Sequence, residues 1–102
     1  MSQEIFVFKS NGIYLGFIKN DFIFSRDGAY LGWLEGQYAW DNLGRFRGVM
    51  MPQNGHNYIL FNQFSMPPVP KTPKPAPAAQ VIPAPQQNIQ PITLPVGFID
   101  GF

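Results

Sequence analysis

Residues 6–18 read FVFKSNGIYLGFI, and the same pattern returns as FIFSRDGAYLGWL at residues 22–34 and as YAWDNLGRFRGVM at residues 38–50. Each copy begins 16 residues after the previous one and has the form aromatic-x-aromatic-x-x-x-Gly-x-aromatic-x-Gly-x-apolar. A repeat with a fixed period indicates equivalent structural units packed side by side. The repeat therefore predicts the architecture before any single residue is interpreted.

Each copy is predicted to form a β-hairpin. Residues 5–9 and 13–19, on either side of the first turn, are rich in the aromatic and β-branched residues typical of strands. The three turns are residues 10–12, 26–28 and 42–44, and each ends in glycine. A two-residue type I′ turn would force Leu43 to a positive φ. We therefore expect a three-residue loop, in which a type I turn is followed by a left-handed glycine.

This loop sets a register that places every position shared by the three copies on one face. It pairs Phe8 with Tyr14 and sets Phe6 opposite Gly16, where an aromatic ring covers the bare glycine backbone. We interpret this face as the core of a closed barrel. Its expected members are Phe6, Phe8, Tyr14, Phe22, Phe24, Tyr30, Tyr38, Trp40 and Phe46.

The opposite face is less regular and is unusually apolar for an outer surface. Its large apolar members are Leu15, Phe17, Leu31 and Trp33. Exposed apolar patches mark contact surfaces. We therefore predict an interaction face here, for self-association, for a membrane surface or for a partner protein.

A fourth hairpin is predicted from two separated segments. Residues 56–62 resemble residues 36–42, and Val96-Gly97-Phe98-Ile99 resembles residues 15–18. Ten of the eleven prolines lie between them, from Pro67 to Pro95. We predict a barrel of residues 1–66 and 94–102 with a proline-rich insertion at 67–93, and a last strand that pairs with residues 58–62 and with the first strand. Closing so long a loop costs only about 2 kcal/mol more than closing a short turn. The alternative is a domain that ends near Met66, followed by a disordered tail.

These residues resemble a known family. The hairpin pattern makes residues 5–61 and 96–101 similar to the four-fold beta-flower domain. The resemblance implies a shallow, nearly symmetric antiparallel barrel with an apolar centre, and it implies no enzyme activity. Beta-flower proteins are likened to tubby-type barrels, which by analogy suggests peripheral membrane or lipid contact. Membrane-occupation and choline-binding repeats are also rich in glycine and aromatic residues, but their units are longer.

The composition argues against several functions. The 102 residues carry a net charge of +1 and no cysteine, so we expect neither a nucleic-acid-binding surface nor a thiolate metal site. His56 is the only histidine, and no pair of carboxylates recurs at one position, so we expect no catalytic site, metal or cofactor. The chain shows no signal peptide, and no segment reaches the roughly 20 apolar residues of a membrane-spanning helix. A cytoplasmic location is therefore expected.

The sequence thus predicts an all-β, non-enzymatic binding module. In one hypothesis the outer face and the proline-rich arm engage a partner protein or a second copy of the chain. In the other, the aromatic barrel mouth binds a small lipid or nucleotide-derived ligand. The candidate ligand-binding residues are Trp40, Phe46, Tyr14, Tyr30, Phe8 and Phe24. The prolines favour extended polyproline II, either as a solvated loop or as an arm for aromatic grooves, with Lys71 and Lys74 placed to touch an acidic surface.

Overall fold

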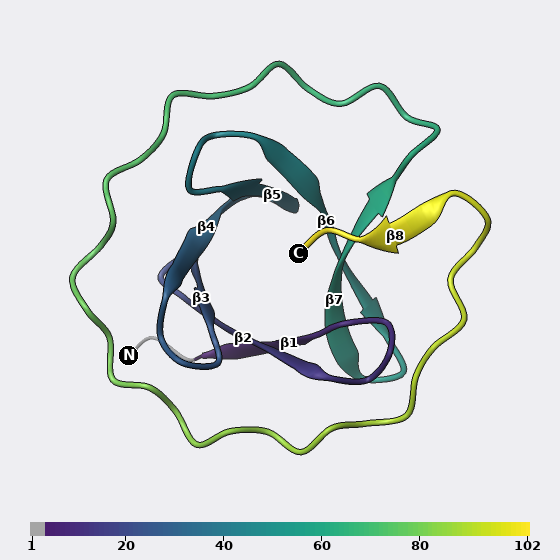
Figure 1. Cartoon of the computed structure of the whole chain (residues 1–102), viewed down its shortest axis with the longest axis horizontal. Coiled ribbons are helices and arrows are strands. Elements are labelled where there is room, and N and C mark those ends of the chain that lie inside the picture. The colour runs from purple at the N-terminus through teal and green to yellow at the C-terminus, as the bar shows by residue number, and fades with distance from the viewer. Residues whose placement is uncertain (1–3) are drawn as a thin grey trace.

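The computed structural model of the chain describes residues 4–102, and this range forms eight β-strands and no helix. Three antiparallel hairpins join β1 (Ile5–Phe8) to β2 (Tyr14–Lys19), β3 (Phe22–Ser25) to β4 (Tyr30–Glu35), and β5 (Tyr38–Asp41) to β6 (Phe46–Gln53). A fourth joins β7 (His56–Asn62) to β8 (Phe98–Asp100) across the proline-rich segment. The prediction of an all-β barrel built from hairpins is confirmed (Figure 1).

The ring closes between β1 and β7 and not, as the sequence suggested, between the first and last strands. Val7 pairs with Asn57, and Phe8 with Tyr58, in the parallel direction. Strand β8 pairs only with the end of β7, so the barrel is a closed ring of seven strands with an eighth strand attached. A hydrogen-bonded contact still ties β8 to the first turn, because the Asp100 carboxylate accepts bonds of 2.7 Å from the backbone N–H and from the hydroxyl of Ser10.

The three turns share one geometry, as predicted. The N–H of Gly12 donates to the carbonyl of Lys9 at 2.8 Å, and the N–H of Lys9 donates to the carbonyl of Ile13 at 2.9 Å. The same two bonds recur in the turns that contain Gly28 and Gly44. All three glycines have φ between 84° and 89°, a left-handed conformation that glycine adopts without steric cost.

A β-bulge just beyond each turn corrects the predicted register. The expected pair forms between Phe8 and Tyr14. Leu15 is then left unpaired, so that Gly16 lies opposite Val7. Equivalent shifts occur in β4 and β6. An extra residue moves every later side chain of its strand to the other face of the sheet.

The bulges make the barrel interior aliphatic rather than aromatic, which overturns the predicted core. One non-aromatic apolar side chain from each strand of the ring meets its neighbours on the barrel axis. These residues are Val7, Ile18, Ile23, Leu34, Ala39, Met50 and Ile59. So small a ring leaves room for side chains of this size only. The nine aromatic residues that were expected inside therefore point outward.

Residues 67–95, called here the proline belt, wrap around the barrel and cover part of its outward aromatic face (Figure 1). The belt contains no strand or helix. Its half-buried residues from Pro77 to Ile92 recur at every third position, which is the period of polyproline II. The insertion thus lies along the barrel with one edge turned inward, and does not project from it.

The mid-strand glycines allow neighbouring hairpins to approach each other closely. Gly32 lies opposite Ile23 within its own hairpin, not opposite an aromatic residue as predicted. On its other side it pairs with Asp41, and a Cβ atom at Gly32 would overlap the carbonyl oxygen of Trp40. Gly16 meets the carbonyl of Phe24 in the same way. These glycines are therefore required where one hairpin packs against the next.

We expect Gly32→Ala to lower the free energy of unfolding by about 2 kcal/mol, because the added methyl group forces two hydrogen-bonded strands apart. The measurement is urea unfolding followed by circular dichroism. Gly36→Asn is the matched control, because a Cβ at Gly36 meets no atom within 4 Å and asparagine tolerates its φ of 60°. Equal losses in the two variants would contradict the role assigned to the close approach.

Candidate functional site

The outward face of the barrel carries the aromatic residues of the repeat in groups of three. In the first hairpin, the ring centroid of Tyr14 lies 6.1 Å from that of Phe6 and 5.7 Å from that of Phe8. The second and third hairpins repeat the arrangement. Such edge and tilted contacts stabilise ring pairs by about 0.5–1.5 kcal/mol beyond burial. The repeat therefore builds three similar aromatic sectors around the barrel.

Three polar atoms of this face are buried and have no hydrogen-bond partner within residues 4–102. They are the hydroxyls of Tyr14 and Tyr30 and the indole Nε1 of Trp40. Burial raises the pKa of both tyrosines, although the charge of Arg26 opposes the effect at Tyr14, so both hydroxyls remain protonated at neutral pH. Buried tyrosine and tryptophan donors usually have an acceptor. The buried side of this face thus holds three donors that lack an acceptor.

The proline belt docks on the turn glycines of all three sectors. The N–H of Lys71 donates to the carbonyl of Gly44, and the N–H of Ile89 donates to the carbonyl of Gly12, both at 2.8 Å. The side chain of Ile82 packs against Gly28. The belt therefore meets the hairpins in the order third, second, first, through backbone N–H groups at the third and first and through an apolar side chain at the second.

Two belt lysines hold the belt to the third sector in a cluster that we call the lysine clamp: Glu35, Trp33, Trp40, Lys71 and Lys74. The Lys71 Nζ lies 2.8 Å from Glu35 Oε2 and 5.1 Å from the centroid of the Trp40 ring. The Lys74 Nζ lies 3.7 Å from Glu35 Oε1 and 5.3 Å from the Trp33 ring. Each ammonium group thus contacts one carboxylate and one indole face, the arrangement in which cation–π attraction adds to an ion pair.

The clamp favours the ionised form of Glu35. The hydrogen bond from Lys71, and then that from the indole of Trp33, lowers the pKa of the Glu35 carboxyl. A carboxyl with a lowered pKa loses its stabilising contribution as the pH falls through that pKa. The clamp is therefore fully formed at neutral pH and weakens in acid.

The axial mouth of the barrel, at the end that holds the turns, is a hollow of about 370 Å³ with the C-terminal residue in its wall. Leu15, Leu31 and Phe102 pack against the aliphatic core there. Figure 1 shows the C-terminal end over the centre of the ring. The Arg47 guanidinium lies 4.7 Å from the ring centroid of Phe102. This mouth is therefore not the aromatic opening that the sequence suggested.

Asp41 is the one buried acidic residue of the mouth. Its carboxylate accepts hydrogen bonds from the N–H groups of Leu43 at 2.9 Å and Arg45 at 3.0 Å. The side chains of Arg45 and Arg47 bind it at 3.1 and 3.3 Å. Burial alone would raise the pKa of Asp41, but these hydrogen bonds outweigh burial and lower it. Ser25 performs the same turn role in the second hairpin with its hydroxyl.

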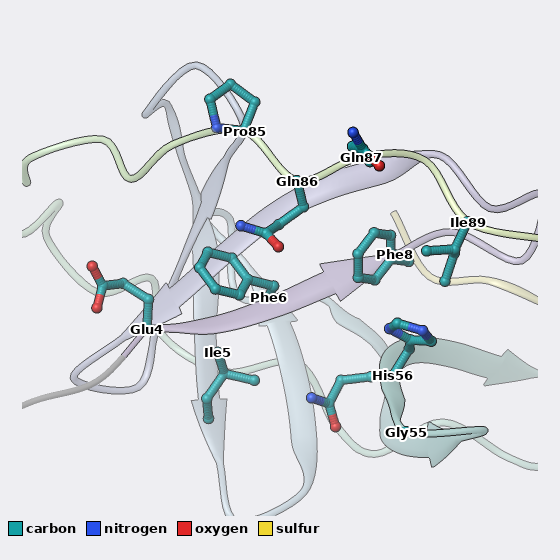
Figure 2. Close-up of a pocket in the computed structure, with 11 residues that line it drawn as sticks. Glu4, Ile5, Phe6, Phe8, Gly55, His56, Pro85, Gln86, Gln87 and Ile89 are labelled. Atoms are coloured by element: carbon teal, nitrogen blue, oxygen red, sulfur yellow. The ribbon is translucent and has the colours of Figure 1, made fainter.

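A cleft of about 660 Å³ lies between β1, the turn before β7 and the belt, and we call it the β1 cleft. Figure 2 shows Phe6 and Phe8 directed toward the belt, with Gln86 near Phe6 and His56 near Phe8. The ring centroids of Phe8 and His56 are 5.2 Å apart. Its lining residues are Glu4, Ile5, Phe6, Phe8, Gly55, His56, Asn57, Pro85, Gln86, Gln87 and Ile89. Glu4 is the only carboxylate among them.

A second opening, the apolar slot, lies where the belt leaves the barrel. It has a volume of about 340 Å³ and is lined by uncharged residues only. They are Tyr38, Phe46, Val49, Met51, Leu60, Asn62, Ser65, Met66, Pro67, Pro68 and Phe98. Met66 is 93% exposed and Tyr38 is 48% exposed, so apolar surface continues outward from the slot.

The predicted site residues do not lie together at the places that the sequence suggested. The six candidate ligand-binding residues, among them Trp40 and Phe46, lie on the outward face and not at the mouth. The predicted interaction face is divided by the bulges. Phe17 and Trp33 join the aromatic face and are at most 1% exposed, whereas Leu15 and Leu31 line the axial mouth.

Sequence reasoning missed Glu35 and the pairing of Lys71 and Lys74 with the two tryptophans. A signal was present: residues 68, 71, 74, 77, 80, 83, 86, 89 and 92 share one three-residue phase, and this phase contains both lysines and both half-buried isoleucines of the belt. A polyproline II segment turns such residues to one side. This three-residue spacing could have predicted that one side of the belt contacts another surface. It could not have predicted which surface that is.

Comparison with known proteins identifies the family. A model of the 4-fold beta flower protein family matches residues 2–97. The chain belongs to this family. No curated protein and no solved structure matches this beta flower protein. Over residues 4–102, no helix is long and apolar enough to cross a membrane, and no group of three or more histidine, aspartate or glutamate side chains is placed to hold a metal ion.

Replacing both belt lysines with methionine (Lys71→Met with Lys74→Met) should loosen the belt, because the side-chain length is kept while the charges that meet Glu35 and the indoles are removed. We expect cleavage of the belt by proteinase K to be about three to ten times faster than in the native chain. Lys9→Met is the control for loss of a lysine elsewhere. Unchanged cleavage, with the barrel folded, would mean that the clamp does not hold the belt.

The Asp41 carboxylate should make the barrel sensitive to acid. Its pKa is lower in the folded chain than in the unfolded chain, so its contribution is complete above about pH 4 and is lost as the pH falls through the folded pKa. We expect Asp41→Asn to be less stable at pH 7 and to lose less further stability between pH 5 and pH 2 than the native chain. Urea unfolding over a pH series measures both effects, with Asp27→Asn as an exposed turn control.

Proposed function

We propose that this beta flower protein is a non-enzymatic interaction module whose aromatic face binds extended, proline-rich segments that carry lysine. The supporting observation is the belt itself. It lies on the aromatic sectors with every third residue turned inward, and its two lysines rest on the two tryptophans. The chain thus carries an example of the ligand class that its surface accepts.

The chemistry of the face suits such a segment. Aromatic grooves bind polyproline II because it is already extended and loses little conformational entropy on docking. Lys71 and Lys74 are one polyproline II turn apart, so both ammonium groups reach Glu35 from the same edge. A partner needs the belt pattern of lysines three residues apart among prolines.

The belt competes with any such partner because it is part of the same chain. A tethered segment has an effective concentration in the millimolar range. Many belt residues are nevertheless exposed, and the backbone contacts are confined to a few positions. A second copy of the chain, which carries the same belt, and an unrelated protein are the two partner types that fit this chemistry.

A second candidate function rests on the apolar slot. A cavity of this size with an uncharged lining suits a small apolar ligand, and Phe46 contributes to its wall. Native mass spectrometry of the chain purified from its host tests this candidate. A bound mass supports it, and a mass equal to that of the chain alone counts against it.

The main proposal is tested with the intrinsic fluorescence of Trp33 and Trp40, the only two tryptophans of the chain. The full-length variant with Lys71→Met and Lys74→Met is titrated with a peptide of residues 67–76, PPVPKTPKPA. We expect saturable quenching with a dissociation constant on the order of 100 µM, and weaker binding to the native chain, whose own lysines occupy the clamp.

The matched control is the same peptide with both lysines replaced by methionine, which should bind at least about fivefold more weakly. A folded variant whose tryptophan emission does not change up to millimolar peptide would refute recognition of proline-rich segments by this face. Equal binding of the two peptides would remove lysine from the proposed ligand class.

A further inference from the structure

The charge beside the aromatic pair differs between the three sectors. In the third sector, Glu35 pairs across the strands with Tyr38, the first aromatic residue of that repeat. In the second sector the corresponding partner of Phe22 is Lys19. In the first sector the nearest carboxylate is that of Glu4, which precedes β1 and lies one repeat position later than Lys19 and Glu35. The first and third sectors thus each have one carboxylate near the first aromatic residue of the repeat, at neighbouring repeat positions, and the second has a lysine there.

The belt matches this pattern in the third sector but not in the first. Its only two lysines, Lys71 and Lys74, lie over the third sector, where they pair with Glu35. Over the first sector the same edge of the belt presents Gln86, which is neutral. Within residues 4–102, Glu4 has no ion-pair partner. The first sector therefore has a carboxylate and two aromatic rings along one cleft, with no lysine or arginine beside them.

We propose that the β1 cleft binds an organic ammonium group, as found on a lysine side chain, between Glu4 and the rings of Phe6 and Phe8. The carboxylate supplies the opposite charge and the rings supply their electron-rich faces. The amide oxygens of Asn57, Gln86 and Gln87, which line the cleft, accept the remaining N–H bonds of the ammonium group. The lysine clamp of the third sector is the internal precedent for this recognition.

The residues that line the cleft also argue against an anionic ligand. Glu4 and His56 are its only titratable side chains, and no lysine or arginine lines it. An anion would meet the Glu4 carboxylate without a fixed positive charge to bind it. The cleft is open along the belt and its volume of about 660 Å³ is larger than one lysine side chain needs, so a polypeptide can enter with its lysine. This inference is independent of the proposed function, because it concerns a different sector of the face.

The test is titration of the full-length protein with n-butylammonium, which has the atoms of a lysine side chain, followed by NMR. We expect saturable shifts of the His56 ring and of the Gln86 and Gln87 side-chain amides, with a dissociation constant of about 1–10 mM. Glu4→Gln should weaken binding about fivefold or more. Gln86→Lys should also abolish most of the shift, because the new ammonium group occupies the cleft and pairs with Glu4.

Neutral 1-butanol is the matched ligand control. Equal shifts with 1-butanol, or equal binding by the Glu4→Gln variant, would overturn the proposal, as would shifts confined to other parts of the barrel. Tryptophan fluorescence, which reports on the lysine clamp, should not change in this titration, so the outcome is separate from that of the proline-rich peptide.

An N-acetylated Pro-Lys-Pro tripeptide amide distinguishes the source of the ammonium group. Tighter binding than that of n-butylammonium indicates a polypeptide lysine, and equal binding indicates a free amine. Both results support recognition of an ammonium group.

Discussion

In each of three hairpins, one unpaired residue just beyond the turn reverses the two faces of the strand that follows. Leu15 and its equivalents sit in these bulges, and their effect is to turn Ile18 inward and Phe17 outward. The ring then encloses only aliphatic side chains, which a barrel of seven short strands can hold. A full set of aromatic rings is thereby left on the outside, where the proline belt and the lysine clamp contact it.

An outward aromatic face needs a cover, and the proline belt supplies one from within the chain. Ordering a segment costs about 1–2 kcal/mol per residue in backbone entropy, but prolines already restrict the unfolded chain and reduce that cost. The belt contacts the barrel at separated points, among them backbone bonds to two turn glycines and a lysine clamp at one sector. A cover held at separated points can open locally while the barrel stays folded.

The repeat makes the three sectors alike in shape, and a few charged residues make them different in binding. Glu35 and Glu4 make two sectors acidic, whereas Lys19 makes the sector between them basic. The belt places its lysines over one acidic sector and neutral amides over the other. The two proposals therefore concern one kind of chemistry, an ammonium group between a carboxylate and aromatic rings. In the lysine clamp the belt lysines supply that group, and in the β1 cleft a ligand would supply it. Their tests use different reporters, so one can fail while the other stands.

The sequence by itself determined the hairpins, their turns and the family. The spacing of Gly12, Gly28 and Gly44 was enough, because turn geometry depends on local backbone preferences that a short stretch of residues carries. The fourth hairpin was also foreseeable, since loop closure tolerates a long insertion.

Only the tertiary structure decided which face of the sheet is inside, where the ring closes, and what covers the aromatic residues. The residue pattern does not reveal a bulge when both faces of a strand are apolar, because either register then buries apolar side chains. The lysine clamp joins Glu35 to Lys71, which lie 36 positions apart in the sequence, and the belt reaches Gly12 from residue 89. Such contacts depend on the path of the whole chain around the barrel, which no local pattern of residues specifies.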